Sequence, residues 1–273
     1  MLRESFVLLP RVGRRTEKRL WGQGIRDWNS FIAAPSISGF SRRVKEAHDR
    51  LLSVARERLI AGDSAFFAPL LSPSEHWRLY QEFRDEACFL DIETGMRNEV
   101  TVVGMAMGDQ CYTLLRGSTL DKEAIQRLLS RAKILVTFNG RSFDVPALEK
   151  YFGLGIEIPH VDLRHACAAV GLTGGLKRIE QEMGIARRAE LSVLRGARSL
   201  QDGSRAHGPG SVAPKLWNAY RATGDEYYLD ILVKYNEEDC VNLQAVADRV
   251  VPRLWDVVRR GSKDGIQPQF HHV

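Results

Sequence analysis

The sequence predicts an α/β domain with a mixed β-sheet flanked by helices, preceded by a small all-helical module at the N-terminus. The first observation is that three strand-like runs follow one another after residue 86, before helical and strand-like segments alternate. The second is that residues 1–60 carry 13 Lys and Arg against 6 Asp and Glu, whereas the rest of the chain carries 26 against 28. We therefore expect a basic helical module with its linker at 1–74, the α/β domain at 75–260 and a tail at 261–273.

The N-terminal module begins with Phe6–Ile32, which predicts a helix, a tight turn at Pro10–Gly13 and a second helix. An Arg- and Lys-rich helical pattern at 41–60 follows, and residues 66–74 read as an irregular linker. Residues 75–84 predict a helix that leads into the next domain. The positive charge of the module favours contact with a polyanion, and a solvated basic surface is the open alternative.

The α/β domain opens with an antiparallel meander, because a Gly-Asp turn separates its second and third strand-like runs. A fully apolar run, KILVTF, suits a central strand. The glycine-rich stretch 187–211 lacks periodicity and predicts a long mobile or functional loop. In chain order the expected elements are strands at 87–92, 100–108 and 110–115, a helix at 120–131, a strand at 133–138, a helix at 143–152, a strand running into a helix at 161–170, and helices at 176–183, 212–223 and 226–250.

Composition is that of an ordinary soluble globular protein, with 44% hydrophobic and 27% charged residues. No run approaches the roughly 18–20 apolar residues that span a bilayer, and charges interrupt the N-terminus before an apolar leader region can form. The four cysteines are far apart in the sequence and predict reduced thiols rather than a zinc site. We expect a cytoplasmic protein without a membrane partner, and the sequence identifies no protein partner.

The first candidate site residues close a short apolar strand. Side chains alternate between the two faces of a strand, so Asp91 and Glu93 face the same side near its end. An isolated Asp-x-Glu is common by chance, but two charges at the end of a buried strand are costly unless they bind something. The pair therefore predicts a binding site at this end of the strand.

Two further patterns place acidic residues on helices. After the apolar central strand, an Asn-Gly turn leads to Asp144 in the first turn of the next helix, where the helix dipole stabilises a carboxylate. In the last long helix, Tyr235 and Asp239 are four residues apart and share a face. Each pattern alone has an ordinary interpretation, a helix-start residue for Asp144 and a solvated acidic patch for Glu237–Asp239.

Taken together, the three patterns resemble the DEDD exonuclease superfamily, whose members have a ribonuclease-H-like fold. Asp-Ile-Glu-Thr-Gly at 91–95 is similar to the first motif and Phe-Asn-Gly-x-x-Phe-Asp at 138–144 to the second. Tyr-x-x-x-Asp at 235–239 is similar to the third motif in its tyrosine form, which marks the DEDDy subgroup. The resemblance covers about residues 86–253, and the segments at 161–165 and 176–180 look most like the YprB-like branch.

This resemblance implies a 3′→5′ exonuclease that hydrolyses phosphodiester bonds by a two-metal-ion mechanism and releases nucleoside 5′-monophosphates. It implies two Mg²⁺ or Mn²⁺ ions held by Asp91, Glu93, Asp144 and Asp239, with Asp91 bridging both. Crowded carboxylates repel one another, and hard divalent cations supply the counter-charge. Tyr235 belongs to the implied catalytic set, and a phenol with an ordinary pKa of about 10 is better suited to orienting water than to acting as a base at neutral pH.

Other residues are candidates for contact with nucleic acid. The stretch Leu9–Thr16 resembles the helix-hairpin-helix module, in which the hairpin and its cations grip one phosphate. The alternative is a helical hairpin that only packs on the body. Asn139 is expected to anchor its turn or to contact the terminal nucleotide, and Lys177 to contact phosphate or to lie on the surface. The full set of candidates is Gly13, Arg14, Arg15, Lys18, Asn139 and Lys177.

The sequence leaves three functions open. A nuclease acting on the 3′ end of DNA is favoured, and an exoribonuclease acting on RNA keeps the same fold and site. A catalytically silent nucleic-acid-binding subunit is the alternative from a different class. The presence of every acidic motif residue and of Tyr235 argues against the silent alternative, because a degenerate site usually loses at least one of them.

Overall fold

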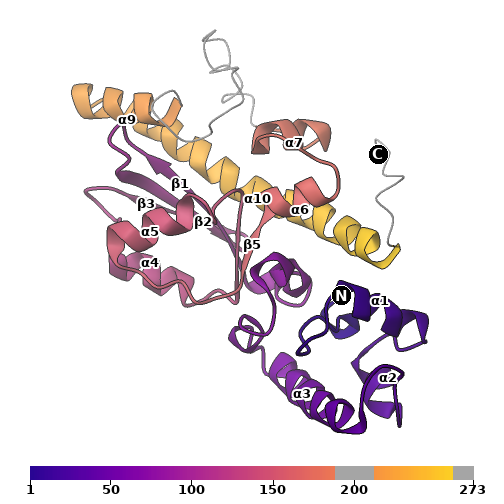
Figure 1. Ribbon diagram of the computed structural model, residues 1–273. Helices are drawn as coiled ribbons and strands as arrows, with labels where there is room; N and C mark the ends of the chain where they lie inside the picture. The colour runs from indigo at the N-terminus through magenta and orange to yellow at the C-terminus, as the bar shows by residue number, and fades with distance from the viewer. Residues whose placement is uncertain (188–211, 261–273) are drawn as a thin grey trace.

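The computed structural model describes residues 1–187 and 212–260, and its N-terminal helices lie together at one end of a sheet-containing part (Figure 1). The sheet has five strands in the order β3-β2-β1-β4-β5. β1 (Ala87–Thr94), β2 (Val100–Met107) and β3 (Gln110–Leu115) form the antiparallel meander. β4 (Ile134–Thr137) and β5 (His160–Asp162) extend the sheet in parallel with β1. The predicted mixed sheet is therefore confirmed.

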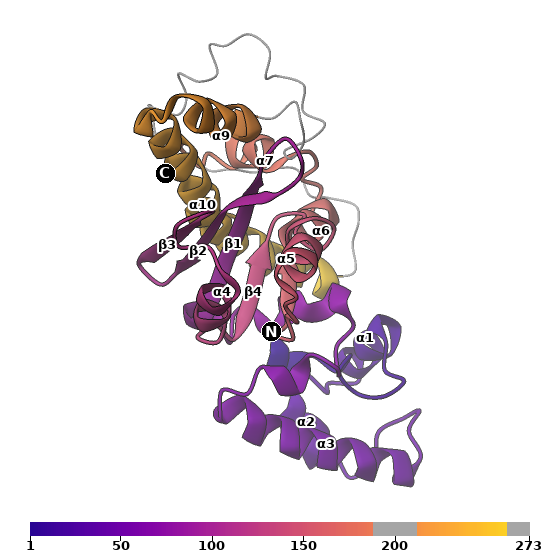
Figure 2. The same cartoon turned by 90° about the vertical axis from the view of Figure 1, so that its left-hand side faces the viewer.

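Helices cover both faces of this sheet (Figure 2). α4 (Lys122–Leu129) and α5 (Asp144–Phe152) lie on one face, and the long α10 (Glu226–Arg260) crosses the other. Side chains of β1 alternate between the two faces of the sheet. On the α4 side, Cys88, Leu90 and Ile92 pack in one hydrophobic cluster with Ile125 of α4. Phe89 packs on the opposite side, in the cluster that contains the core residues of α10. By the same alternation, Asp91 and Glu93 also face α10.

The remaining α-helices that the structure describes in this part agree with the expected positions. They are α6 (Leu163–Ala169), α7 (Leu176–Glu182) and α9 (Val212–Thr223). α10 is longer than expected and continues past Pro252 to Arg260. Proline removes a helical hydrogen bond, but Leu254, Trp255 and Val258 after it are buried in the core, which stabilises the extension. The loop expected at 187–211 lies outside the described residues except for Arg187, as does the tail at 261–273.

The N-terminal part is helical, as expected, but two elements differ from the prediction. No α-helix precedes the Pro10–Gly13 turn. A short 3₁₀ helix at Leu2–Glu4 is followed by successive tight turns over residues 6–12, in which Leu9 N–H donates to the Phe6 carbonyl and Val12 N–H to the Leu9 carbonyl. Residues 75–84 do not form an α-helix and instead contribute to short 3₁₀ helices. The elements are η1 (Leu2–Glu4), α1 (Arg14–Gly22), α2 (Trp28–Ala33), α3 (Arg42–Ile60), η2 (Ala65–Phe67), η3 (Pro73–Leu79) and η4 (Arg84–Glu86).

The N-terminal part and α10 share one hydrophobic core. The rings of Trp21 and Trp255 meet edge to face with centroids 5.7 Å apart. Beside them, Arg78 Nη2 lies 2.9 Å from Glu17 Oε2, and both side chains are fully buried. The division at residue 74 stays a prediction, and contacts across it join both parts.

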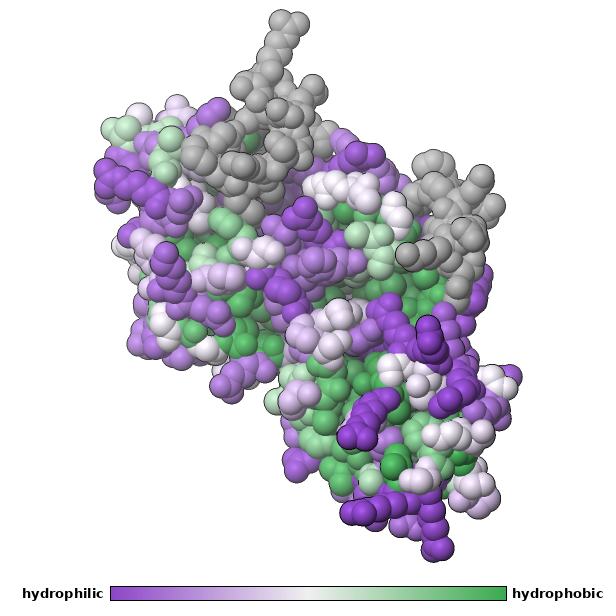
Figure 3. Space-filling model, viewed as in Figure 1, coloured by the Kyte–Doolittle hydropathy of each residue, from purple (hydrophilic) through white to green (hydrophobic). Residues whose placement is uncertain are grey.

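The surface seen in Figure 3 mixes hydrophilic and hydrophobic areas, with hydrophobic residues visible between hydrophilic ones over the N-terminal part. No helix among the described residues is long and apolar enough to cross a membrane.

Candidate active site

β1 brings the first two carboxylates to the α10 face of the sheet. Asp91 and Glu93 lie two residues apart on this strand and are 8% and 3% exposed. The β1–β2 register shifts between Glu93 and Thr94, where the strand pairing becomes irregular. Thr101 Oγ1 donates to the Glu93 carbonyl at 3.0 Å, which ties β2 to the end of β1. The two side chains are therefore presented by a fixed, buried backbone.

The turn after β4 places Asp144 against the same strand. Asn139 adopts a left-handed φ of 66°, and its side-chain oxygen accepts a hydrogen bond from Arg164 at 2.6 Å. Asp144 begins α5, and its Oδ1 accepts from the Ile92 N–H at 3.1 Å. Its other oxygen, Oδ2, is buried and has no hydrogen-bond partner among the described residues. A buried, unsatisfied carboxylate oxygen is costly and suits a cation ligand.

α10 carries the third motif across the sheet. One carboxylate oxygen from each of Asp91, Glu93 and Asp239 lies within 4.8 Å of the others. Burial, followed by the charge of Asp239, raises the pKa of both Asp91 and Glu93 well above the ordinary range. Burial also raises the pKa of Asp144 to about 7. The cluster therefore resists full ionisation in the absence of a counter-ion.

Tyr235 lies beside the cluster, one helical turn before Asp239. Burial, followed by the charges of Asp239 and Glu93, raises the pKa of its phenol well above the ordinary value. Lys177 donates a hydrogen bond to the phenol oxygen, and its ammonium lies 4.1 Å from the ring centroid. The phenol is therefore protonated at neutral pH, and Lys177 contacts it from the first turn of α7.

Asn236 is a site residue that sequence reasoning missed. Its fully buried amide donates to the backbone carbonyl of Asp91 at 3.1 Å and to Asp91 Oδ2 at 2.9 Å. One side chain thus holds both the backbone and the carboxylate of Asp91. In the sequence, only its position next to Tyr235 could have pointed to Asn236 as a site residue. Its hydrogen-bond partner, Asp91, is 145 residues away.

Glu180 and Arg187 were also missed. Glu180 of α7 is 1% exposed, and both its oxygens accept hydrogen bonds from the Arg187 guanidinium. The same guanidinium donates to Asp239 Oδ1 and lies 3.6 Å from Glu238 Oε2. A Glu followed seven residues later by an Arg gives no recognisable motif, so only the fold reveals the connection.

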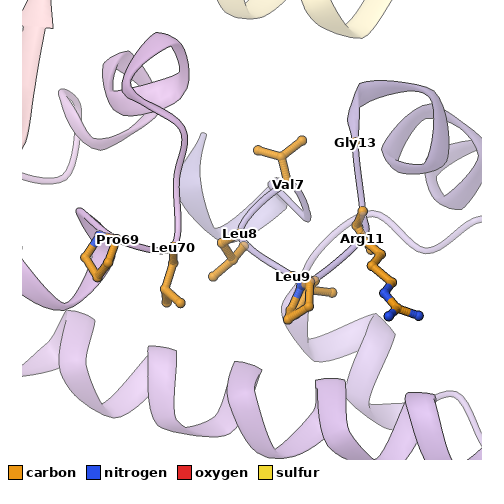
Figure 4. Close-up of a pocket in the computed structure, with 9 residues that line it drawn as sticks. Val7, Leu8, Leu9, Arg11, Gly13, Pro69 and Leu70 are labelled. Atoms are coloured by element: carbon orange, nitrogen blue, oxygen red, sulfur yellow. The ribbon is translucent and has the colours of Figure 1, made fainter.

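The predicted phosphate-binding residues of the N-terminal part lie apart from the carboxylates. Gly13 precedes α1 as its N-cap, and Arg15 and Lys18 are exposed. Arg14 is half-exposed and pairs with Glu75, its Nε lying 2.5 Å from Oε1. The turn before α1 borders a pocket (Figure 4). The volume of this pocket is about 550 Å³. The residues that line this pocket are Val7, Leu8, Leu9, Pro10, Arg11, Val12, Gly13, Pro69 and Leu70.

The site residues fit a hard divalent cation. Asp91, Glu93 and Asp239 offer only oxygen donors. Asp144 is not part of this group of three, but it is held on the backbone of Ile92, next to Asp91, and its Oδ2 is a further buried oxygen without a hydrogen-bond partner among the described residues. Mg²⁺ and Mn²⁺ prefer such ligands, whereas zinc sites usually use nitrogen and sulfur. The raised pKa values of Asp91, Glu93 and Asp144 indicate that the cluster lacks positive charge. A divalent ion would supply it.

Comparison with known proteins agrees with the fold. The family model of the RNase H superfamily matches residues 88–251, which run from β1 into α10. The search of curated proteins and the search of solved structures found no match. The matched segment covers more than half of the chain and contains the whole carboxylate cluster, Tyr235, Asn236 and Glu180. This chain belongs to the RNase H superfamily, whose nuclease-type chemistry fits a buried acidic cluster.

Proposed function

We propose that this protein is a metal-dependent 3′→5′ exonuclease of the DEDDy type, most similar to the YprB-like branch, that acts on DNA. The observation that carries the proposal is the convergence of Asp91, Glu93 and Asp239 to within 4.8 Å inside the matched RNase H segment. Tyr235, four residues before Asp239, supports the tyrosine subgroup, since the histidine form would have His at position 234, where this chain has Lys. Nucleoside 5′-monophosphates would be the products.

The carboxylates would hold two Mg²⁺ or Mn²⁺ ions. Asp91, Glu93 and Asp239 would bind the first, and Asp91 together with Asp144 the second. When bound, such ions neutralise the cluster and stabilise the attacking and leaving oxygens of the phosphodiester. Asn236 fixes the orientation of Asp91, which has to serve both positions.

Tyr235 would orient the attacking water. Lys177 can only donate, so it takes a lone pair of the phenol oxygen and leaves the phenolic hydrogen for another acceptor. The raised pKa of Tyr235 keeps that hydrogen in place. The phenol therefore acts as a hydrogen-bond donor beside the carboxylates rather than as a base.

Nucleic acid would be bound at two places. Gly13, Arg15 and Lys18 at the start of α1 would contact backbone phosphate in a helix-hairpin-helix-like manner, with Arg14 contributing from its pair with Glu75. Near the carboxylates, Asn139 would face the terminal nucleotide, while its hydrogen bond from Arg164 equally suits a turn anchor. Lys177 would reach phosphate only by leaving Tyr235.

The test uses DNA and RNA oligomers of one sequence, each incubated with Mg²⁺, Mn²⁺ or EDTA. We expect mononucleotide release from DNA with either metal, none with EDTA, and a loss of at least 100-fold for Asp91→Asn. Asp109→Asn removes an exposed carboxylate from the β2–β3 turn and should leave the rate unchanged. Faster release from RNA would favour the exoribonuclease, and binding without cleavage under either metal would favour the silent subunit.

A further inference from the structure

A buried chain of charged and polar side chains connects α7 to Asp239. Asn242 Nδ2 donates to Glu180 Oε1 at 3.1 Å, and Arg187 Nη2 donates to the same oxygen at 2.7 Å. Arg187 Nε donates to the other Glu180 oxygen, and Nη2 also donates to Asp239 Oδ1. Arg187 and Glu180 are only 9% and 1% exposed as side chains. One guanidinium thus bridges a carboxylate of α7 and a carboxylate of the acidic cluster.

The end of α7 is shaped so that Arg187 returns to Glu180. Gly184 has a left-handed φ of 67°, and its N–H donates to the Gln181 carbonyl at 3.2 Å. Ile185 N–H then reaches back to the Glu180 carbonyl at 2.8 Å. This pair of bonds is the Schellman ending of a helix, which reverses the chain direction. Arg187 is thereby carried back over the helix turn that holds Glu180.

The arrangement fixes geometry and adds little net charge. Arg187 and Glu180 carry opposite charges, so together they change the electrostatic potential at Asp239 far less than either would alone. A guanidinium is planar and donates through a rigid fork, so its two bonds to Glu180 set the direction of the third bond. With Oδ1 occupied by Arg187, rotation of the Asp239 carboxylate is restricted.

We propose that Arg187, anchored by Glu180, is a positioning residue that orients Asp239 for binding the metal ion. The proposal rests on the metal site of the proposed function. Groups that hydrogen-bond to metal ligands typically change metal affinity by about 10- to 100-fold. Glu180 and Arg187 would therefore be required for metal affinity although neither binds the metal.

The test measures Mn²⁺ affinity by calorimetry without nucleic acid. The double variant Glu180→Gln/Arg187→Gln removes one charge of each sign, so its net charge is that of the wild type. We expect its Mn²⁺ affinity to fall about 10-fold. The matched control is Arg178→Gln/Glu182→Gln, which removes an exposed pair on the same helix with Arg178 Nε 2.9 Å from Glu182 Oε1. This control should bind Mn²⁺ as the wild type does.

A second variant guards against misfolding of the first. Arg187→Lys keeps the charge and loses the planar fork, and we expect it to weaken Mn²⁺ binding at an unchanged circular dichroism spectrum. Wild-type or tighter affinity in both folded variants would overturn the positioning role while leaving the metal site intact. Absence of Mn²⁺ binding by the wild type would instead overturn the metal site and the proposed function with it.

Discussion

At the scale of single residues, Asp144 has the most informative chemistry. Burial raises its pKa to about 7, so the folded, metal-free protein holds a proton that the unfolded chain releases near pH 4. The folded state then binds more protons than the unfolded state between these values. The stability that Asp144 contributes is therefore fully present below about pH 4 and is lost as the pH rises toward 7, by up to about 1.4 kcal/mol per pH unit.

Asp144→Asn should remove this pH dependence. The amide oxygen can still accept from the Ile92 N–H, but it cannot ionise. In EDTA, we expect the free energy of unfolding from urea titrations to fall less steeply between pH 5 and 7 in the variant than in the wild type. Parallel slopes would mean that Asp144 keeps an ordinary pKa.

Tyr235→Phe distinguishes a role of the Tyr235 hydroxyl in catalysis from a role in metal binding. The ring keeps its packing, and only the hydroxyl that accepts from Lys177 is lost. We predict a drop in kcat of about 100-fold, the lower range for a group that assists proton positioning, with Mn²⁺ affinity unchanged. A lowered Mn²⁺ affinity with normal turnover per bound metal would show that Tyr235 supports the metal site instead.

Sequence spacing predicts which site residues face the same way within a single strand or helix. Asp91 and Glu93 share a face because a strand alternates, and Tyr235 with Asp239 because a helix repeats every 3.6 residues. Glu180, Arg187 and Asn236 act through partners that only the tertiary fold brings near. Lys177 was expected at phosphate or on the surface. The packing of α7 places its ammonium against Tyr235, a contact that the sequence did not predict, and its contact with phosphate stays a prediction.

At the scale of elements, the site depends on how closely α10 approaches the sheet. Gly104 of β2 lies directly under this helix, opposite Asp91 in the strand register. A Cβ added there would be 2.1 Å from Asn236 Oδ1 and 2.7 Å from Cys240 Sγ. The missing side chain therefore allows α10 to bring Asn236 and Asp239 to β1. The sequence predicted strand and helix, but this requirement at Gly104 appears only in their packing.

Gly104→Ala should push α10 away from β1. Overpacking of this kind typically costs about 1–3 kcal/mol, and the shift should also weaken Mn²⁺ binding. Urea unfolding and calorimetry check the two effects. Gly155→Ala is the control, since a Cβ there has nothing within 4 Å and the backbone has no positive φ. Wild-type stability and metal affinity in Gly104→Ala would contradict the role given to this close approach.

At the scale of the whole molecule, the N-terminal part is packed into the same core as the end of α10. The buried Arg78–Glu17 pair and the Trp21–Trp255 contact cross the boundary predicted at residue 74. Charge distribution predicted a basic module but carries no information on packing, so this shared core could not be foreseen. Removing residues 1–60 would expose that core, and single charge changes are the cleaner way to test the module.

Arg15→Gln/Lys18→Gln tests whether the start of α1 binds nucleic-acid backbone. Both side chains are exposed, so the fold should be unaffected. We expect weaker DNA binding and a shallower dependence of log affinity on log salt, by about one unit for each lost phosphate contact. Arg42→Gln on α3 is the control for lost positive charge. Equal salt slopes in the double variant and the wild type would exclude these two residues from the interface.

The central claim is that the carboxylate cluster cleaves nucleic acid from the 3′ end with metal. The most direct measurement follows 5′-labelled single-stranded DNA with Mn²⁺ over time, for the wild type and Asp239→Asn. We predict a ladder that shortens one nucleotide at a time and disappears in the variant. Immediate release of the labelled mononucleotide, scattered internal cuts, or an unchanged ladder in Asp239→Asn would contradict it.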